Sequence, residues 1–294
     1  MNAPLPATPH VVPFFFNVDP GTRFCLYYPP NPGLPSRGAI LYVHPFAEEM
    51  NQSRRMAAQQ ARAFAAIGYA VLQMDLFGCG DSCGDFSSGR WEQWKRDLAV
   101  AAEWLAERTS GQPLHLWGVR LGGLLALDFA ATCKVETIIL WQPFMNGRTC
   151  INQFLGLRLE AGLDNPMDNA MNSVQTNAIP APRSTSALRA ELVTRGRIEV
   201  AGYELDAALA KGIDACDASA IKLLPCEVHW FASGARAARK QAVNAARLAG
   251  HWAPLGVNLH LHAVDGLPFW ATSDIAECPA LLAATAAVFA PDPS

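Results

Sequence analysis

The chain has 294 residues, 51% of them hydrophobic, and its formal net charge is −3 at pH 7. This length suits one large α/β domain with an insertion, or two small domains, and it is enough to bury a sizeable core. A slightly acidic chain gives no electrostatic reason to expect nucleic acid or an anionic membrane surface as a partner. No run approaches the roughly 18 uninterrupted apolar residues that span a bilayer, so we do not expect an integral membrane protein.

The N-terminal segment and the cysteines both favour a cytoplasmic protein. Residues 1–13 carry no Lys or Arg, so the basic region of a secretory signal is missing. The eight cysteines are scattered, and the closest pair, Cys79 and Cys83, lies in a Gly-rich segment without companion His ligands. We therefore expect reduced thiols, no metal site and no cofactor.

The first half of the chain alternates short apolar runs with amphipathic stretches. This order is typical of a largely parallel sheet with helices on both faces. The expected elements, in chain order, are a hairpin (residues 11–18 and 24–28), a strand (39–43), a helix (53–67), a strand (69–74), a helix (91–105), a strand (114–117), an apolar helix from residue 124 and a strand (135–141).

The pattern breaks down between about residues 146 and 220. This stretch contains Pro180, Pro182 and several Asn and Ser residues, with a small hairpin expected around residues 197–203. We interpret it as a cap insertion over the carboxyl edge of the sheet. Residues 1–145 and 221–294 would then form one α/β domain, whose second part contains a strand (227–231), a helix (236–248), a strand (257–264) and a last helix (279–289).

The segment Gly118-Val119-Arg120-Leu121-Gly122 stands between an expected strand and an expected helix. A strand, Gly-x-x-x-Gly and a helix in this order are typical of a nucleophile elbow, in which the central residue is held at a strained corner. The flanking positions must be small because neighbouring strands crowd them. The following helix directs its N–H groups and its dipole at whatever binds above.

Two further segments agree with this reading. Tyr42–Phe46 follows a strand, where an oxyanion loop would lie, and the backbone N–H groups of Phe46 and Leu121 could form an oxyanion hole. We expect His44 to shape this loop. Asp75–Ser82 follows the next strand as a D-x-x-G-x-G-x-S segment, whose first residue we expect to cap or orient the adjacent turns.

The elbow, the loop from His44 to Asn51, the segment Asp75–Ser82 and the ending Gly266–Trp270 resemble those of the α/β-hydrolase superfamily. The resemblance implies an α/β-hydrolase fold, a mostly parallel sheet flanked by helices with a cap insertion. More narrowly, the Glu-rich loop and the Phe-Trp ending resemble the hydrolase 2 group associated with exosortase A systems. That narrower resemblance implies a genetic association with exopolysaccharide production and protein sorting, and no known substrate.

A serine hydrolase of this fold needs Ser at the elbow, Asp or Glu after a later strand and His after the last strand. The elbow holds Arg120, and a guanidinium is always protonated and cannot act as a nucleophile. The expected acid loop, residues 233–238, has no carboxylate, and the expected base loop, residues 265–270, has no His. Because all three positions fail together, we predict that acyl transfer by the serine triad is absent.

Other residues offer weaker routes to catalysis. His260 and His262 lie on one face of the last expected strand, and either is an alternative base. Ser82 and Cys79 lie near the expected rim of the pocket as displaced nucleophiles, without an evident base beside them. For the histidines, a sheet-packed or hydrogen-bonded side chain is the preferred interpretation.

A cation at a helix N-terminus is costly unless it is paired, so Arg120 needs a partner. The simpler interpretation is an ion pair with Glu48 or Glu49 from the loop opposite, which closes the old site. The alternative is an anion receptor, in which the guanidinium and nearby N–H groups bind a carboxylate or phosphate. The residues expected at a ligand are Arg120, Leu121, Phe46, His44, Glu48 and Glu49.

Three functions remain open from the sequence. The favoured one is a non-catalytic protein that binds a small anionic or acyl ligand, or a partner protein, through the capped pocket. The second is a hydrolase of ester or thioester bonds that uses a non-standard constellation. The third is a scaffold, with the apolar cap as an interface.

Overall fold

The computed structural model describes residues 10–164, 184–272 and 276–290. Its centre is an eight-stranded sheet in the order β1-β2-β4-β3-β5-β6-β9-β10, parallel from β4 onwards. The strands are β1 (Val12–Asn17), β2 (Thr22–Tyr28), β3 (Gly38–Val43), β4 (Tyr69–Met74), β5 (Leu114–Val119), β6 (Thr137–Trp141), β9 (Glu227–Ser233) and β10 (Asn258–Val264).

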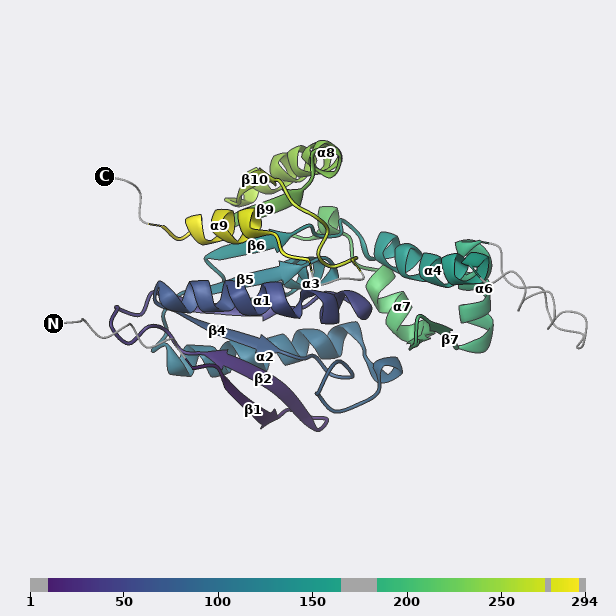
Figure 1. Ribbon diagram of the computed structural model, residues 1–294, viewed down its shortest axis with the longest axis horizontal. Helices are drawn as coiled ribbons and strands as arrows, with labels where there is room; N and C mark the ends of the chain where they lie inside the picture. The colour runs from purple at the N-terminus through teal and green to yellow at the C-terminus, as the bar shows by residue number, and fades with distance from the viewer. Residues whose placement is uncertain (1–9, 165–183, 273–275, 291–294) are drawn as a thin grey trace, which may run out of the picture.

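Helices cover both faces of the sheet (Figure 1). On one face lie α1 (Glu48–Ala66) and α9 (Pro279–Ala287), packed on an aromatic core that includes Trp117, Trp141 and Phe231. On the other face lie α2 (Trp91–Arg108), α3 (Leu121–Ala130) and α8 (Ala235–Trp252). The central strands are buried on both sides, which explains their continuous apolar runs. The expected mostly parallel sheet between helices is confirmed.

The stretch between β6 and β9 lies at one end of the sheet (Figure 1). Its described elements are α4 (Gly147–Asp164), α6 (Thr185–Arg195), the hairpin of β7 (Arg197–Val200) and β8 (Tyr203–Asp206), α7 (Ala207–Asp214) and a 3-10 turn, η2 (Ala218–Ala220). The small hairpin expected near residue 200 is therefore present. Pro180 and Pro182 lie outside the described residues.

The first helix begins five residues earlier than the apolar spacing predicts, at Glu48 and not at Ser53. Its first turn has Met50 as its single apolar residue, so apolar spacing marks it only weakly. Two Glu residues nevertheless favour a helix start there, because carboxylates near an N-terminus are stabilised by the helix dipole. Glu48 and Glu49, expected in a loop, are thus on α1, and this fixes which way each side chain points.

Among the described helices, none combines the length and the apolar character needed to cross a membrane. Both ends of the insertion return to the sheet close to the elbow. The N–H of Gly147, at the start of α4, donates to the carbonyl of Cys216 at 2.9 Å, and the N–H of Ala218 donates to the carbonyl of Met145 at 2.8 Å. The insertion is therefore held against the carboxyl ends of the parallel strands, where ligands of open α/β sheets bind.

Candidate active site

The turn between β5 and α3 has the geometry of a nucleophile elbow. Arg120 lies there with φ 55° and ψ −117°, in the left-handed region that side chains rarely adopt. A Cβ on Gly118 would lie 2.5 Å from Cα of Gly123, and one on Gly122 would lie 2.2 Å from the carbonyl oxygen of Val43. Only glycine fits at these two positions, so the sequence pattern reports a real steric demand.

The guanidinium of Arg120 is buried, with 8% of the residue exposed, and it is bound on several sides. Its Nε donates to Oε1 of Glu49 at 3.0 Å, and its Nη2 donates to Oε1 of Gln153 at 3.0 Å. Its Nη1 donates to the backbone carbonyl of Gln142 at 3.4 Å. Arg120 therefore forms an ion pair with Glu49 of α1 and, at the same time, a hydrogen bond with Gln153 of α4.

Two aromatic rings also contact the guanidinium. Its carbon lies 4.1 Å from the ring centre of Phe144 and 5.2 Å from that of Trp270. Such contacts attract a cation to the ring faces, most strongly where water is excluded. Trp270 belongs to the segment after β10, where a serine hydrolase places its histidine, and its neighbour Phe269 packs on Trp141 at 5.7 Å.

Of the two glutamates expected near Arg120, the structure brings Glu49 to it and not Glu48. Burial raises the pKa of Glu49 above its usual value, and the charge and hydrogen bond of Arg120 act against that rise. Its second oxygen, Oε2, is buried and has no hydrogen-bond partner among the described residues. Glu48 instead accepts a hydrogen bond from the hydroxyl of Tyr203 at 3.3 Å, because adjacent helix residues point to different sides.

His44 is a buried structural residue of the loop after β3. Its Nδ1 lies 2.8 Å from the carbonyl oxygen of Pro45, and its Nε2 accepts the backbone N–H of Leu76 at 3.2 Å. Donation from Nδ1 and acceptance at Nε2 fix a neutral ring. Burial also lowers the pKa of His44, despite the opposing charge of Asp75. Both ring nitrogens are thus engaged in holding the loop in shape.

The displaced nucleophiles considered from the sequence are also held in structural roles. Oγ of Ser82 donates to the carbonyl of Asp75 at 2.5 Å and accepts from the N–H of Phe24 at 2.9 Å. Burial and the charges of Asp75 and Asp97 raise the pKa of the Cys79 thiol. Neither side chain is prepared to attack a carbonyl carbon.

His260 and His262 do not meet Arg120. In the sheet, His262 is aligned with Phe231, Trp141 and Val119 on successive strands. Three strand spacings, roughly 14 Å, therefore separate it from the strand that carries the elbow. His260 lies one pleat farther from the carboxyl edge.

The carboxylates near the acid position are likewise distant or exposed. Strand β9 ends at Ser233, whose N–H donates to the side chain of Gln142 at 2.9 Å, and α8 begins two residues later. Asp265, after β10, is exposed. Glu227 is the register partner of Thr137 at the start of β6. It therefore lies at the amino ends of the parallel strands, whereas the elbow lies at their carboxyl ends.

Two cavities open on different sides of the first turns of α1. The cavity beside the Arg120–Glu49 pair has a volume of about 150 Å³ and is mainly apolar. Its lining residues are Phe46, Glu48, Glu49, Gln52, Phe144, Cys150, Gln153, Phe154, Leu157, Trp270 and Ala271. Gln153 and Gln142, which complete the contacts of Arg120, carried no signal in the sequence. In the sequence, Trp270 is marked only as the last residue of the segment Gly266–Trp270.

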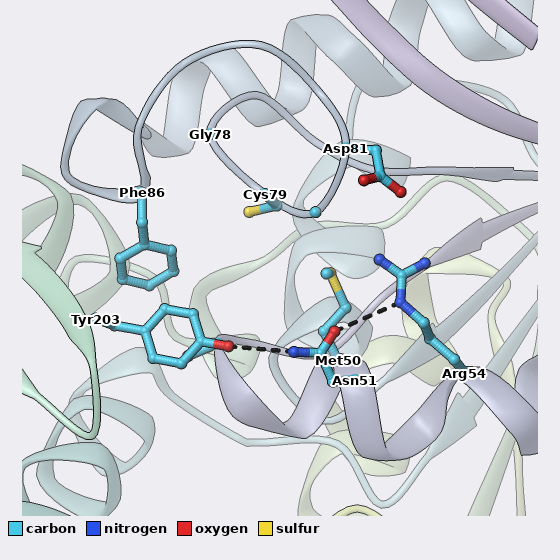
Figure 2. A pocket seen from close by; sticks show the side chains of 10 residues that line it. Met50, Asn51, Arg54, Gly78, Cys79, Asp81, Phe86 and Tyr203 are labelled. Atoms are coloured by element: carbon cyan, nitrogen blue, oxygen red, sulfur yellow. Dashed lines mark hydrogen bonds between the residues drawn. The ribbon is translucent and has the colours of Figure 1, made fainter.

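The second cavity, of about 610 Å³, is more open and more polar (Figure 2). It is lined by Ala47, Met50, Asn51, Arg54, Gly78, Cys79, Gly80, Asp81, Phe86 and Tyr203. Asn51 bridges the ring hydroxyl of Tyr203 at 3.4 Å and Nε of Arg54 at 3.5 Å. This cavity therefore joins the insertion to α1 and to the Gly-rich segment after β4.

Solved structures share this arrangement of strands and helices. Est1E from Butyrivibrio proteoclasticus with bound ferulic acid has a TM-score of 0.66 and 13% identity, covering 94% of this chain and 97% of that one. An α/β serine hydrolase homologue from Coxiella burnetii has a TM-score of 0.55 and 11% identity, covering 95% and 97%. At this identity the likeness establishes the α/β-hydrolase fold.

Among curated proteins, human Protein ABHD12B is 29% identical over 160 residues, which are 47% of this chain and 43% of the relative. The lysophosphatidylserine lipase ABHD12 of Xenopus tropicalis is 31% identical over 114 residues, 37% and 28% of the two chains. This chain spans less than half the length of these relatives. The family model of serine aminopeptidase S33 matches residues 35–217, more than half of the chain. The chain therefore belongs to the serine aminopeptidase S33 family of the α/β-hydrolase superfamily.

Proposed function

We propose that this chain does not hydrolyse its ligand but binds a small acyl molecule with an anionic head group in the cavity beside Arg120. The observation that carries this proposal is the position of Arg120, which occupies the elbow with a side chain that cannot be a nucleophile. In the described parts of the segments after β9 and β10, which leave out residues 273–275, no carboxylate or imidazole lies near it. On this view the serine triad is degenerate at all three positions.

The lining of the cavity supports an acyl ligand. Phe46, Phe144, Phe154 and Leu157 offer apolar and aromatic surface, which stabilises a hydrocarbon chain by removing it from water. The polar groups are few and gather at Arg120, Glu49 and its neighbours. Apolar walls with a small polar cluster are the usual composition of a small-molecule site.

The polar cluster supports an anionic head group. Among the described residues, three of the five guanidinium N–H bonds of Arg120 go to Glu49, Gln142 and Gln153, so two can serve a ligand. A carboxylate or phosphate arriving there would also approach Glu49. Since burial already raises the pKa of Glu49, the ligand would favour its protonation, and the neutral carboxyl could then donate a hydrogen bond from Oε2. Binding of an anion should therefore take up a proton.

Among the curated relatives, the Xenopus protein is named for lysophosphatidylserine, which supports the same ligand class here. The narrower resemblance to the hydrolase 2 group of exosortase A systems adds a proposed setting in exopolysaccharide production and protein sorting. The scattered cysteines keep the cytoplasm as the proposed compartment. A partner protein at the insertion is an alternative occupant of the same edge.

Binding can be tested by calorimetric titration with octanoate, octanol and acetate. We expect octanoate to bind best, because acetate lacks the chain and octanol lacks the charge. Arg120→Met should reduce octanoate affinity by about tenfold or more, the effect of losing a charge-assisted hydrogen bond. Affinity of the wild type should rise as pH falls from neutral towards the raised pKa of Glu49, as long as octanoate itself stays ionised.

Arg54→Met is the matched control, since Arg54 lines the larger cavity and has the same side-chain type. It should leave octanoate affinity unchanged. Loss of binding in Arg54→Met with retention in Arg120→Met would move the ligand to the larger cavity and overturn the assignment. Equal affinity for octanoate and octanol would remove the anion-binding role of Arg120.

The second candidate is an active ester or thioester hydrolase with a non-standard constellation. The family membership and the preserved elbow geometry favour it. Hydrolysis of p-nitrophenyl acetate, butyrate and octanoate separates the two candidates. We expect no turnover above background in the wild type, and none in Arg120→Ser, which restores a hydroxyl without a base. Turnover lost in His260→Gln or His262→Gln but kept in Arg120→Ala would establish a relocated catalytic site.

A further inference from the structure

Histidines gather on one face of the last two strands, away from the elbow. His229 on β9 is the register partner of His260 on β10, so their side chains lie side by side on the same face. Glu227 precedes His229 by two residues and His262 follows His260 by two, which keeps all four on that face. α8 packs on the other face of these strands, and His260 is exposed.

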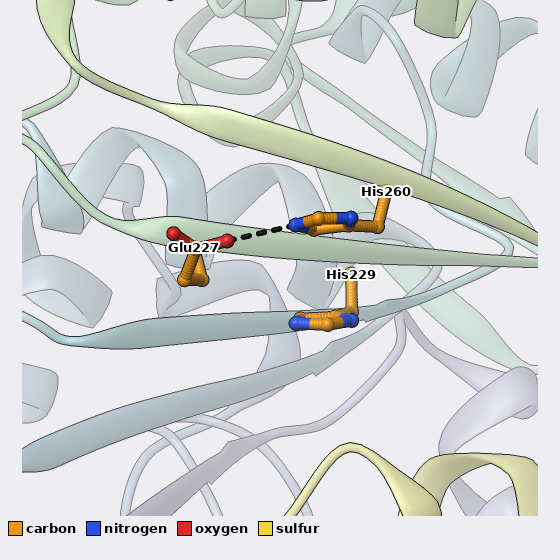
Figure 3. A group of neighbouring side chains, drawn as sticks. All are labelled: Glu227, His229 and His260. Atoms are coloured by element: carbon orange, nitrogen blue, oxygen red, sulfur yellow. Dashed lines mark hydrogen bonds and ion pairs between the residues drawn. The ribbon is translucent and has the colours of Figure 1, made fainter. Parts of the chain in front are cut away.

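Figure 3 shows the ring of His260 stacked on that of His229, with the carboxylate of Glu227 beside His260. Nε2 of His260 lies 2.8 Å from Oε2 of Glu227. The rings of His229 and His260 are stacked with their centres 4.8 Å apart. One ligand atom from each of Glu227, His229 and His260 can be chosen so that all three lie within 4.8 Å of one another.

We propose that Glu227, His229 and His260 bind a divalent first-row transition metal ion, with Zn²⁺ as the reference occupant. Two imidazole nitrogens and one carboxylate oxygen are donors that suit Zn²⁺ and its neighbours in the series. Ligand atoms around a tetrahedral zinc are roughly 3.3 Å apart. The ligand atoms must therefore close by an ångström or so, and the two stacked rings must tilt towards each other. The side chains of Glu227 and His260 are nearly half exposed and have room to rotate in this way.

His262 completes the arrangement from outside the ligand set. Its Nε2 lies 3.0 Å from Nδ1 of His229. With a metal on Nε2 of His229, the proton of that ring is on Nδ1 and is donated to His262. Metal-bound histidines almost always donate their other N–H in this way, and such partners orient the ring. His262 is thus a positioning residue.

The three protein ligands leave part of the coordination sphere to water, because both Glu227 and His260 have side chains more than two-fifths exposed. The ion would tie the edge strand β10 to β9. This site lies on one face of β9 and β10 and does not depend on the ligand proposed beside Arg120.

The test is calorimetric titration of untagged, full-length protein with ZnCl₂, together with visible absorption of the Co²⁺ complex. We expect one saturable site in the wild type and Co²⁺ bands of a site with nitrogen and oxygen donors. Glu227→Gln and His260→Gln should each lose at least about tenfold in Zn²⁺ affinity and lose the Co²⁺ bands. Both side chains are nearly half exposed, and circular dichroism checks that the fold is kept.

His251→Gln is the matched control, an exposed histidine on α8 outside the group, and it should bind Zn²⁺ like the wild type. His262→Gln should lower affinity about tenfold while stoichiometry stays at one. Wild-type affinity in both Glu227→Gln and His260→Gln, or no saturable binding in the wild type, overturns the metal site. Unchanged affinity in His262→Gln overturns its positioning role.

Discussion

Two regions of the same sheet carry charged or ionisable side chains, and their surroundings differ. One region is Arg120 at the elbow, and the other is the group of histidines on β9 and β10. Arg120 is buried at the carboxyl edge, and its contacts come from α1, from the segment after β6 and from α4. The pair of Glu227 and His260 is nearly half exposed, and its partners come from adjacent strands. The two regions differ in how much each group depends on its neighbours.

The difference follows from solvation. A buried guanidinium must be paired inside the protein, since water cannot replace a lost partner. An exposed imidazole keeps water as an alternative and is free to exchange its partner for a metal ion. A substitution at the elbow should therefore change folding stability, whereas one on the histidine face should change ligand binding and leave stability almost as it was.

Arg120→Met should have the largest effect on stability. It removes the cation beside Glu49, whose pKa burial already raises, so the folded pKa should rise further. The folded state then holds a proton that the unfolded state has released, and stability is lost as pH increases through this interval. We expect a loss of about 3 kcal/mol at about pH 8 and a smaller loss at about pH 5, measured by urea denaturation.

The double variant Arg120→Met with Glu49→Gln is the control for this effect. It removes both charges, so it should recover much of the stability lost at high pH. Its free energy of unfolding should no longer change with pH through the titration of Glu49. An equal loss at both pH values in the single variant would show that Glu49 does not depend on Arg120.

Gly122→Ala should cost about 2 kcal/mol, because the new methyl group would overlap the carbonyl oxygens of Val43 and His44 at 2.2 and 2.4 Å. The elbow and the loop after β3 would be forced apart. Gly156→Ala on α4 is the control. A Cβ there meets nothing within 4 Å, and alanine in a helix should stabilise by about 0.5–1 kcal/mol. Thermal unfolding of both variants would check the contrast, and equal changes would contradict a close contact at the elbow.

The wild type should show a weaker form of the same pH dependence when compared with Glu49→Gln. The pKa of Glu49 is raised in the folded protein. At a pH just above the usual carboxyl pKa, Glu49 is therefore still protonated in the folded state but ionised in the unfolded state. The wild type should lose stability relative to Glu49→Gln as pH rises through this window. A difference that increases in the opposite direction would mean that Arg120 outweighs burial at Glu49.

The smallest effect is expected for His260→Gln in metal-free buffer. The ion pair of His260 with Glu227 is exposed on both sides, so stability should change by less than about 0.5 kcal/mol. Urea denaturation with and without Zn²⁺ separates the contributions, because an ion that binds only the folded state stabilises the wild type and not the variant. A large loss of stability in metal-free buffer would show that His260 stabilises the fold, as Arg120 is expected to do at the elbow.

The sequence alone was enough for the order of strands and helices around the elbow and for the failure of Arg120 as a nucleophile. An apolar run marks a buried strand whichever strands it pairs with. Gly118 and Gly122 are required by the close backbone contacts of the turn itself. These are local demands, readable within a few residues. The same locality explains the error at α1, whose first turn has a single apolar residue, Met50, and so gives little apolar periodicity.

Only the tertiary structure decided what surrounds Arg120 and what the histidines face. Glu48 and Glu49 are equivalent in the sequence, but one helical step turns them about 100° apart, so that only Glu49 reaches the guanidinium. Gln153 and Trp270 come from distant segments whose approach depends on how α4 and the chain after β10 pack. His229 and His260 meet because two strands pair in one register, and a shift of one residue would have put them on opposite faces.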